Sequence, residues 1–260
     1  MRPLLIALLT FAYAALAPAA EYERRLVPVA VVMAPGAHGT LWTTRAKAVQ
    51  ELEEGTEIVG DLTLDVPPWI AGGQPYNVFP SSTDREPPGA IMHVRKDVAH
   101  AIHISARLLQ HGPGREHEET AIPVVGEDEF VNHTLYFMPL TRRSDRRVHL
   151  RVYSLDVERA TAAVRVRIQA PLPFRGWTFI YDTVHALDVH QKTRTPMEGG
   201  DPLPLRPYAI EMLLDPLVAD LPPDTELAVS VVPADEGVRI WGIVSETDNT
   251  TQQIRLVFAQ

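Results

Sequence analysis

Residues 225–250 read TELAVSVVPADEGVRIWGIVSETDNT and decide the fold class. Leu227, Val229 and Val231 alternate with polar or small neighbours, the letters PADEG interrupt the pattern, and alternation resumes at Val238. A period of two places successive side chains on opposite faces of a β-strand. The stretch therefore predicts a β-hairpin with one buried face and one face in water.

The composition extends this reading to the whole chain. With 23 prolines, 15 glycines and 45% hydrophobic residues, the chain is too apolar for disorder and too rich in breakers for long helices. Strands are predicted at 26–33, 56–66, 91–95, 99–109, 121–125, 134–140, 148–154, 163–169, 177–181, 184–189 and 253–258. Residues 91–95 and 99–109 are expected to pair as a hairpin, residues 40–52 fit a strand or a helix, and residues 208–219 have the spacing of a short helix.

The polar segment HGPGREHEE, residues 111–119, interrupts the apolar pattern and reads as a domain boundary. Each flanking part has enough strands to close a sandwich. We therefore expect an all-β protein with two tandem antiparallel β-sandwich (Ig-like) domains, at residues 25–113 and 120–260.

The first 20 residues resemble an export signal. Arg2 precedes an apolar run at residues 4–16, and Ala17 and Ala19 give the small-residue ending of a cleavage site. The run is shorter than the roughly 20 apolar residues of a membrane anchor, and no later segment has that length. A signal peptide at residues 1–20 and a secreted or periplasmic location follow, with no membrane span in the mature chain.

The charge limits the classes of partner, and the cysteine content indicates what stabilises the fold. The formal charge of −9 becomes −10 when the signal peptide, which contains Arg2, is removed. A chain this acidic has no electrostatic attraction to nucleic acid. Because the chain has no cysteine, its stability has to come from its apolar core. The expected partner is a protein or a surface polysaccharide.

Two internal patterns suggest a duplication. LVPVAVV followed by GTLW has the order of AIPVV followed by HTLY, about 95 residues later. Residues 91–106 similarly have the order of residues 227–245, with AIHISA corresponding to RIWGIVS. We read these as traces of two related halves, with an insertion in the second half within residues 171–207.

The segments VPVA-x4-PGA-x-GT-x-W and RIWGIVSETDNTTQQI resemble uncharacterised bacterial secreted proteins built from tandem β-sandwich repeats. The resemblance covers most of residues 25–258 and implies an exported adhesion-like or architectural module. It implies no catalytic residue. The first half departs from the pattern, since AIHISARLL lacks both the Trp and the Asp-Asn pair.

No reaction is indicated by the motifs. The chain has no G-x-S-x-G elbow, HEETA at residues 117–121 lacks the second histidine of a metalloprotease helix, and no D-x-D-x-D-G calcium loop occurs. The pair Asp248-Asn249 reads as a turn. We expect no enzyme, no cofactor and no metal site, with a divalent-metal hydrolase as a distant alternative.

Three tryptophans are the candidate ligand-binding residues: Trp69, Trp177 and Trp241. Trp241 follows Ile240 in a strand whose apolar face is Ile240, Gly242 and Val244, so its side chain is expected on the other face. An outward tryptophan covers a domain contact or offers a flat surface to a sugar. The sequence therefore predicts an exported non-enzymatic protein with a structural, adhesion-like or protein-interaction role, with a carbohydrate-binding module as the alternative.

Overall fold

The computed structural model describes residues 21–31, 34–35, 39–52, 55–62, 69–70, 89–97, 99–112, 115–156, 162–188, 193–194 and 203–260. The predicted signal peptide, residues 1–20, lies outside these residues. In the described chain the elements are strands and 3-10 turns, which confirms the all-β prediction.

The strands form four sheets of four or five strands and one two-stranded ribbon, β14 (Thr193–Arg194) with β15 (Leu203–Pro204). Sheet 1 contains β2 (Ala34–Pro35), β3 (Leu41–Leu52), β7 (Ile102–Gly112) and β8 (Arg115–Ile122), with β4 (Gly55–Leu62) also paired to β3. Sheet 2 has the order β5 (Trp69–Ile70), β6 (Ala90–Arg95), β1 (Tyr22–Val27), β9 (Val125–Gly126). All its pairings are antiparallel except that of β5 with β6.

The later strands build the other two sheets. Sheet 3 has the order β16 (Tyr208–Leu213), β11 (Arg146–Ser154), β18 (Trp241–Asp248), β19 (Ile254–Phe258). Sheet 4 has the order β10 (Leu135–Thr141), β17 (Glu226–Pro233), β12 (Ala163–Leu172), β13 (Gly176–Ala186). The 3-10 turns are η2 (Ala99–Ala101), η3 (Glu127–Glu129) and η4 (Asp215–Val218).

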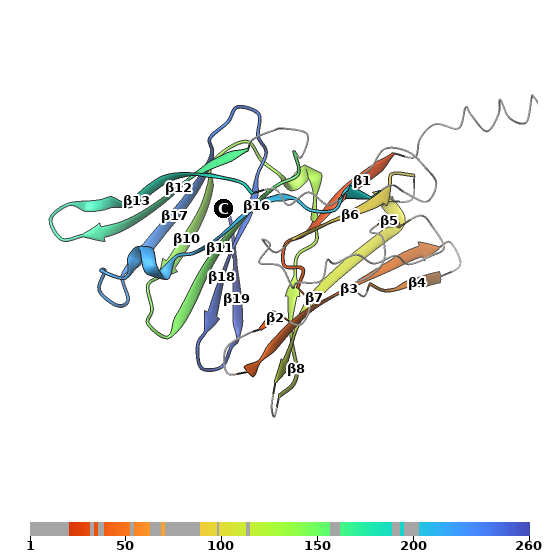
Figure 1. Ribbon diagram of the computed structural model, residues 1–260, viewed down its shortest axis with the longest axis horizontal. Coiled ribbons are helices and arrows are strands. Elements are labelled where there is room, and N and C mark those ends of the chain that lie inside the picture. The colour runs from red at the N-terminus through yellow and green to blue at the C-terminus, as the bar shows by residue number, and fades with distance from the viewer. Residues whose placement is uncertain are drawn as a thin grey trace, which may run out of the picture.

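The four sheets follow one another in the order 1, 2, 3, 4 (Figure 1). In the described residues, three apolar clusters join each sheet to the next. The first core lies between sheets 1 and 2 and contains Val27, Met92 and Ile102. The last core lies between sheets 3 and 4 and contains Leu150 and Val229. The middle core joins sheet 2 to sheet 3, so sheet 2 is covered on both faces.

The predicted hairpin at 225–250 is wrong, although both of its strands exist. β17 pairs with β10 and β12 in sheet 4, whereas β18 pairs with β11 and β19 in sheet 3. Val229 and Val244 both lie in the last core, because the two strands face each other across it. Alternation identifies the buried face of a strand and not its hydrogen-bonded neighbour.

The hairpin expected from residues 91–95 and 99–109 is wrong for the same reason. β6 belongs to sheet 2 and β7 to sheet 1, so the segment between them crosses the first core. Segment 111–119, read as a boundary, instead contains the end of β7 and the start of β8, which pair with each other. The chain leaves sheets 1 and 2 only after β9.

Other predicted elements changed type or length. Residues 40–52 are a strand, and the expected helix at 208–219 is the strand β16 followed by the short turn η4. The two strands predicted at 177–181 and 184–189 are the single strand β13. At residues 40–52 and 208–213, pairing with a neighbouring strand overrides weak local helical spacing.

Candidate interaction surfaces

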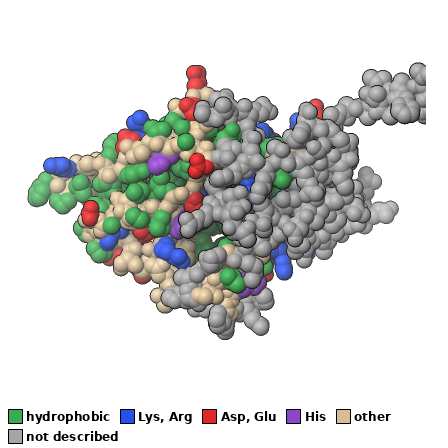
Figure 2. Space-filling model, in the orientation of Figure 1, with side chains coloured by type: hydrophobic (Ala, Val, Ile, Leu, Met, Phe, Trp, Pro, Cys, Tyr) green, Lys and Arg blue, Asp and Glu red, His purple; other side chains and the backbone are tan. Residues whose placement is uncertain are grey.

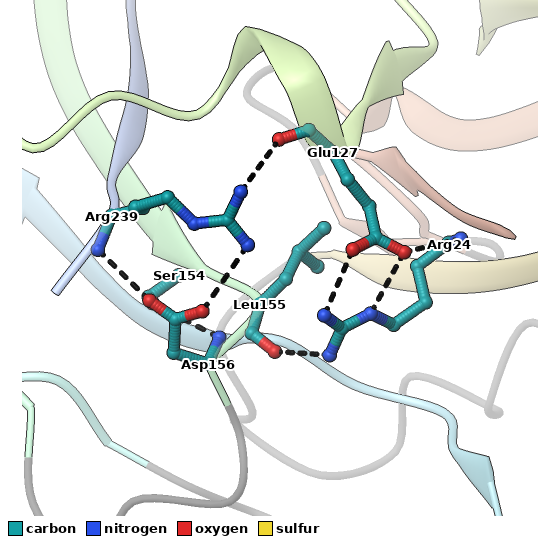
Figure 3. A network of polar contacts seen from close by, with 6 residues as sticks. All are labelled: Arg24, Glu127, Ser154, Leu155, Asp156 and Arg239. Atoms are coloured by element: carbon teal, nitrogen blue, oxygen red, sulfur yellow. Dashed lines mark hydrogen bonds and ion pairs between the residues drawn. The ribbon is translucent and has the colours of Figure 1, made fainter. Parts of the chain in front are cut away.

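A polar network crosses the junction between sheets 2 and 3 (Figure 3). The Arg24 guanidinium donates to both carboxylate oxygens of Glu127, at 3.0 and 2.9 Å, and to the carbonyl of Leu155 at 2.6 Å. Arg239 donates to the Glu127 carbonyl at 3.4 Å, and its backbone N–H donates to Asp156 at 2.9 Å. Burial alone raises the pKa of Glu127, but the bonds from Arg24 outweigh it and hold that pKa below its usual value.

Apolar packing reinforces the junction. Tyr153 is fully buried in the middle core, and its hydroxyl donates to the carbonyl of Pro28 in the first half of the chain. Burial raises the pKa of this phenol. Gly89 has φ +147°, and a Cβ there would lie 2.9 Å from the Tyr153 ring, so only glycine fits.

His93 is buried at the same junction. Its side chain is 1% exposed, and Nε2 lies 2.6 Å from the carbonyl of Pro204, so Nε2 carries the proton and donates it. Nδ1 has no hydrogen-bond partner. Because burial disfavours the imidazolium, the pKa of His93 falls to about 4.

These contacts give the polar groups of the junction a structural role. Its carboxylate and guanidinium groups bond each other or backbone carbonyls, and its histidine is sealed from solvent. The network therefore fixes one half of the molecule against the other.

The β12–β13 hairpin lies at one end of the molecule, away from the junction, and its surface is apolar (Figure 1). The hairpin β12–β13 carries four exposed apolar side chains, here called the hairpin patch: Phe174 (108% exposed), Trp177 (48%), Phe179 (51%) and Val184 (47%). The pairings Pro171–Trp177, Gln169–Phe179 and Arg165–Val184 place the last three on the outer face of sheet 4, away from the last core. Figure 2 shows hydrophobic side chains gathered over this end.

Charged groups lie beside the hairpin patch. The Arg167 guanidinium carbon lies 5.5 Å from the centre of the Phe179 ring, a cation–π contact. Asp182 forms ion pairs with Arg165 at 3.6 Å and Arg167 at 3.4 Å. Apolar groups beside polar ones are the usual make-up of a protein-binding surface.

Phe174 stands at the tip of the hairpin in an unfavourable state. Its φ is +65°, a conformation that bulky residues rarely adopt, and its ring is in water. A fully exposed ring makes no packing contact that would offset this strain. A backbone outlier of this kind points to a functional constraint.

The three predicted tryptophans lie on three different sheets. Trp177 belongs to the hairpin patch, and the backbone of Trp69 forms part of β5 in sheet 2. Trp241 lies in β18 with its ring 6.2 Å from that of Tyr153, against the middle core, so it covers the contact between the halves. Trp177, on the outer face of sheet 4, and Trp241, against the middle core, therefore do not share a surface.

Sequence reasoning missed Phe174 and Phe179. Phe179 lies two residues after Trp177, and that spacing signals a shared face of a strand. Phe174 sits in the turn sequence PFRG, where an aromatic residue is unusual.

Within the described ranges, no three histidine, aspartate or glutamate side chains gather as metal ligands do. No helix in the part of the chain that the structure describes is long and apolar enough to cross a bilayer.

Comparison with known proteins returned no relative: no family model, curated protein or solved structure matches the chain.

Proposed function

We propose that the chain is an exported, non-enzymatic protein of two Ig-like β-sandwich domains that binds another protein through the hairpin patch. Two observations support the two-domain division. The first and last cores are each shared by two facing sheets, and β1–β9 supply sheets 1 and 2 while β10–β13 and β16–β19 supply sheets 3 and 4. The division then falls at about residues 127–134, and the leader at residues 1–20 supports a secreted or periplasmic location.

We also infer that the two halves of the chain are related by duplication. The links β6 to β7 and β17 to β18 both join a strand of one sheet to a strand of the facing sheet. These are the segments that the sequence comparison aligned, so a shared cross-core connection supports duplication.

The observation that carries the binding proposal is Phe174. Exposing an aromatic ring forfeits the stabilisation that burial gives, and the left-handed backbone adds a cost of roughly 1 kcal/mol. Trp177 and Phe179 follow on the same hairpin. A surface of exposed aromatic residues on one short hairpin is explained by a partner that covers it.

A protein fits this surface better than a sugar. Trp, Phe and Arg are the residue types enriched where proteins meet, and Arg167 already occupies one face of the Phe179 ring. In addition, β13 is the last strand of sheet 4, and in the described residues it pairs only with β12. Its outer edge can accept an extended segment of a partner through backbone hydrogen bonds.

Photo-crosslinking tests the proposal. A benzophenone amino acid replaces Phe174, and in a matched control it replaces Glu236, an exposed residue of the turn after β17. In the cells that make this protein, we expect one discrete protein adduct from position 174 and none from position 236. Adducts only to glycan would favour the carbohydrate-binding alternative, and identical background from both positions would contradict protein binding.

A further inference from the structure

A cleft of about 420 Å³ opens between sheet 1 and the turn that joins β18 to β19. Its side chains include one indole, one aliphatic group and several neutral polar groups, and the lining residues are Trp42, Gln110, Glu119, Thr120, Gln252, Gln253 and Ile254. The volume lies in the range of about 300–1,000 Å³ found for small-molecule sites, which often form where two parts of a chain meet.

Gln110 is the informative residue of the cleft. Its side chain is 1% exposed, yet neither Nε2 nor Oε1 has a hydrogen-bond partner. A buried amide without partners costs on the order of 1–3 kcal/mol. Such a group is retained in a wall of the cleft at a cost to stability, which a ligand that bonds both amide atoms would offset.

Gln252, across the cleft, differs from Gln110 because both atoms of its amide are hydrogen-bonded. Its Nε2 donates to the carbonyls of Asn249 at 2.8 Å and Asp248 at 3.2 Å, and its Oε1 accepts from Arg147 at 3.1 Å. Because that amide is fully engaged, it shapes the turn. Of these two buried amides, only that of Gln110 is without a hydrogen-bond partner, and because both its amide atoms are covered, a ligand would bond them only when the cleft wall around Gln110 shifts.

The strand register places an aromatic surface beside the free amide. Gln110 in β7 lies directly opposite Trp42 in β3, and Thr120 in β8 lies opposite Leu108, two residues earlier on the same face as Gln110. Residues paired across strands share a face and lie about 5 Å apart at Cβ. An indole, a carboxamide and a hydroxyl therefore lie together on one face of sheet 1.

The charges restrict the class of ligand. Among the described residues that line the cleft, none is a lysine or an arginine that could hold an anion, and the Glu119 carboxylate pairs with Arg107 on the other face of sheet 1. A carboxamide offers one acceptor and two donor hydrogens, which matches neighbouring hydroxyl groups that both give and take hydrogen bonds. An indole face offers an apolar surface to the C–H groups of a sugar ring.

We propose that this cleft binds a neutral saccharide unit, with the Gln110 carboxamide bonding adjacent hydroxyls and Trp42 covering one face of the ring. The site is separate from the hairpin patch and uses none of its residues. The protein would then hold a polymer at one site and a protein at another.

Fluorine NMR of the full chain labelled with 5-fluorotryptophan tests the site. The probes are the methyl glycosides of glucose, galactose, mannose and N-acetylglucosamine at millimolar concentration, and Trp42→Phe assigns the Trp42 resonance. We expect at least one glycoside to shift the Trp42 resonance and to leave that of Trp177 unmoved. No shift of Trp42 with any probe, a shift of Trp177 alone, or an equal response to glycylglycine would overturn the saccharide assignment.

Variants separate binding from folding. Gln110→Met removes the unpaired amide while keeping the side-chain length, so we expect an unchanged or higher melting temperature and an affinity about tenfold lower. Thr120→Val gives a second measure if that variant fails to fold. Gln169→Met, on the outer face of sheet 4, is the matched control and should bind normally. Undiminished affinity in Gln110→Met would contradict the proposal, whatever the crosslinking at position 174 shows.

Discussion

At the scale of single residues, Phe174 is a position where the residue that would best stabilise the fold differs from the residue that would bind a partner. Its left-handed backbone favours glycine, and its ring makes no core contact. We expect Phe174→Gly to raise the free energy of unfolding by about 1 kcal/mol in urea titrations. The same change at the exposed Tyr136, which has no positive φ, should not stabilise the protein. A loss of stability in Phe174→Gly would show that the ring supports the hairpin.

His93 predicts how stability depends on pH. Its pKa in the folded protein is about 4, against 6.5 for an ordinary histidine, so the unfolded chain binds the proton more readily. Neutral His93 therefore contributes about 3 kcal/mol to the free energy of unfolding. This contribution is complete above pH 6.5 and is lost as the pH drops toward 4.

Chemical denaturation between pH 7 and pH 4 measures this effect. His93→Gln should remove this part of the pH dependence, while His133→Gln, at an exposed position before β10, should keep it. An identical pH profile for His93→Gln and the natural chain would contradict the assignment.

At the scale of elements, side-chain alternation predicted faces well and partners poorly. In β11, Val148, Leu150 and Val152 are buried as their alternation requires. Alternation could not distinguish a hairpin from two strands facing each other across a core, since both bury the same side chains. The first strand was predicted to begin at Leu26, whereas β1 begins at Tyr22 and Arg24 within it is held by Glu127.

The turn η3 joins the halves through Glu127, and this element carries its own prediction. Glu127→Gln removes the charge that Arg24 contacts twice, so we expect a loss of about 2 kcal/mol in the free energy of unfolding at pH 7. Because the pKa of Glu127 is lowered, this contribution is present above its usual pKa and is lost as the pH falls through the folded value.

Asp128→Asn is the control for Glu127→Gln, because Asp128 is exposed in the same turn. Urea titrations at pH 7 should show little change for the control. Equal stability of the two variants would mean that the ion pair adds nothing to the junction.

At the scale of the whole molecule, the sequence indicated an all-β chain, but not the stacking of four sheets. Sheet 2 is buried on both faces, and such packing depends on side chains more than 100 residues apart, such as Leu26 and Tyr153. The hairpin patch was found only in part, through Trp177. The cleft at Gln110 was not found, since its residues come from both ends of the chain.

The middle core predicts that the two halves unfold together. Calorimetry of the natural chain should show one transition. Tyr153→Ala removes the largest fully buried side chain and should cost about 3–5 kcal/mol, with the two halves then melting separately. Tyr136→Ala, at an exposed position, should keep a single transition. Two transitions in the natural chain would show that the junction does not couple the halves.

The most direct test of the hairpin patch is the adduct yield from the photo-crosslinking amino acid at position 174, measured with Trp177 intact and with Trp177→Ser. Trp177 is half-exposed on the outer face of sheet 4, so its loss should leave the fold intact. We predict a discrete protein adduct that disappears in the Trp177→Ser background while the melting temperature stays the same. The same adduct yield in both backgrounds would contradict the claim that this patch binds a protein.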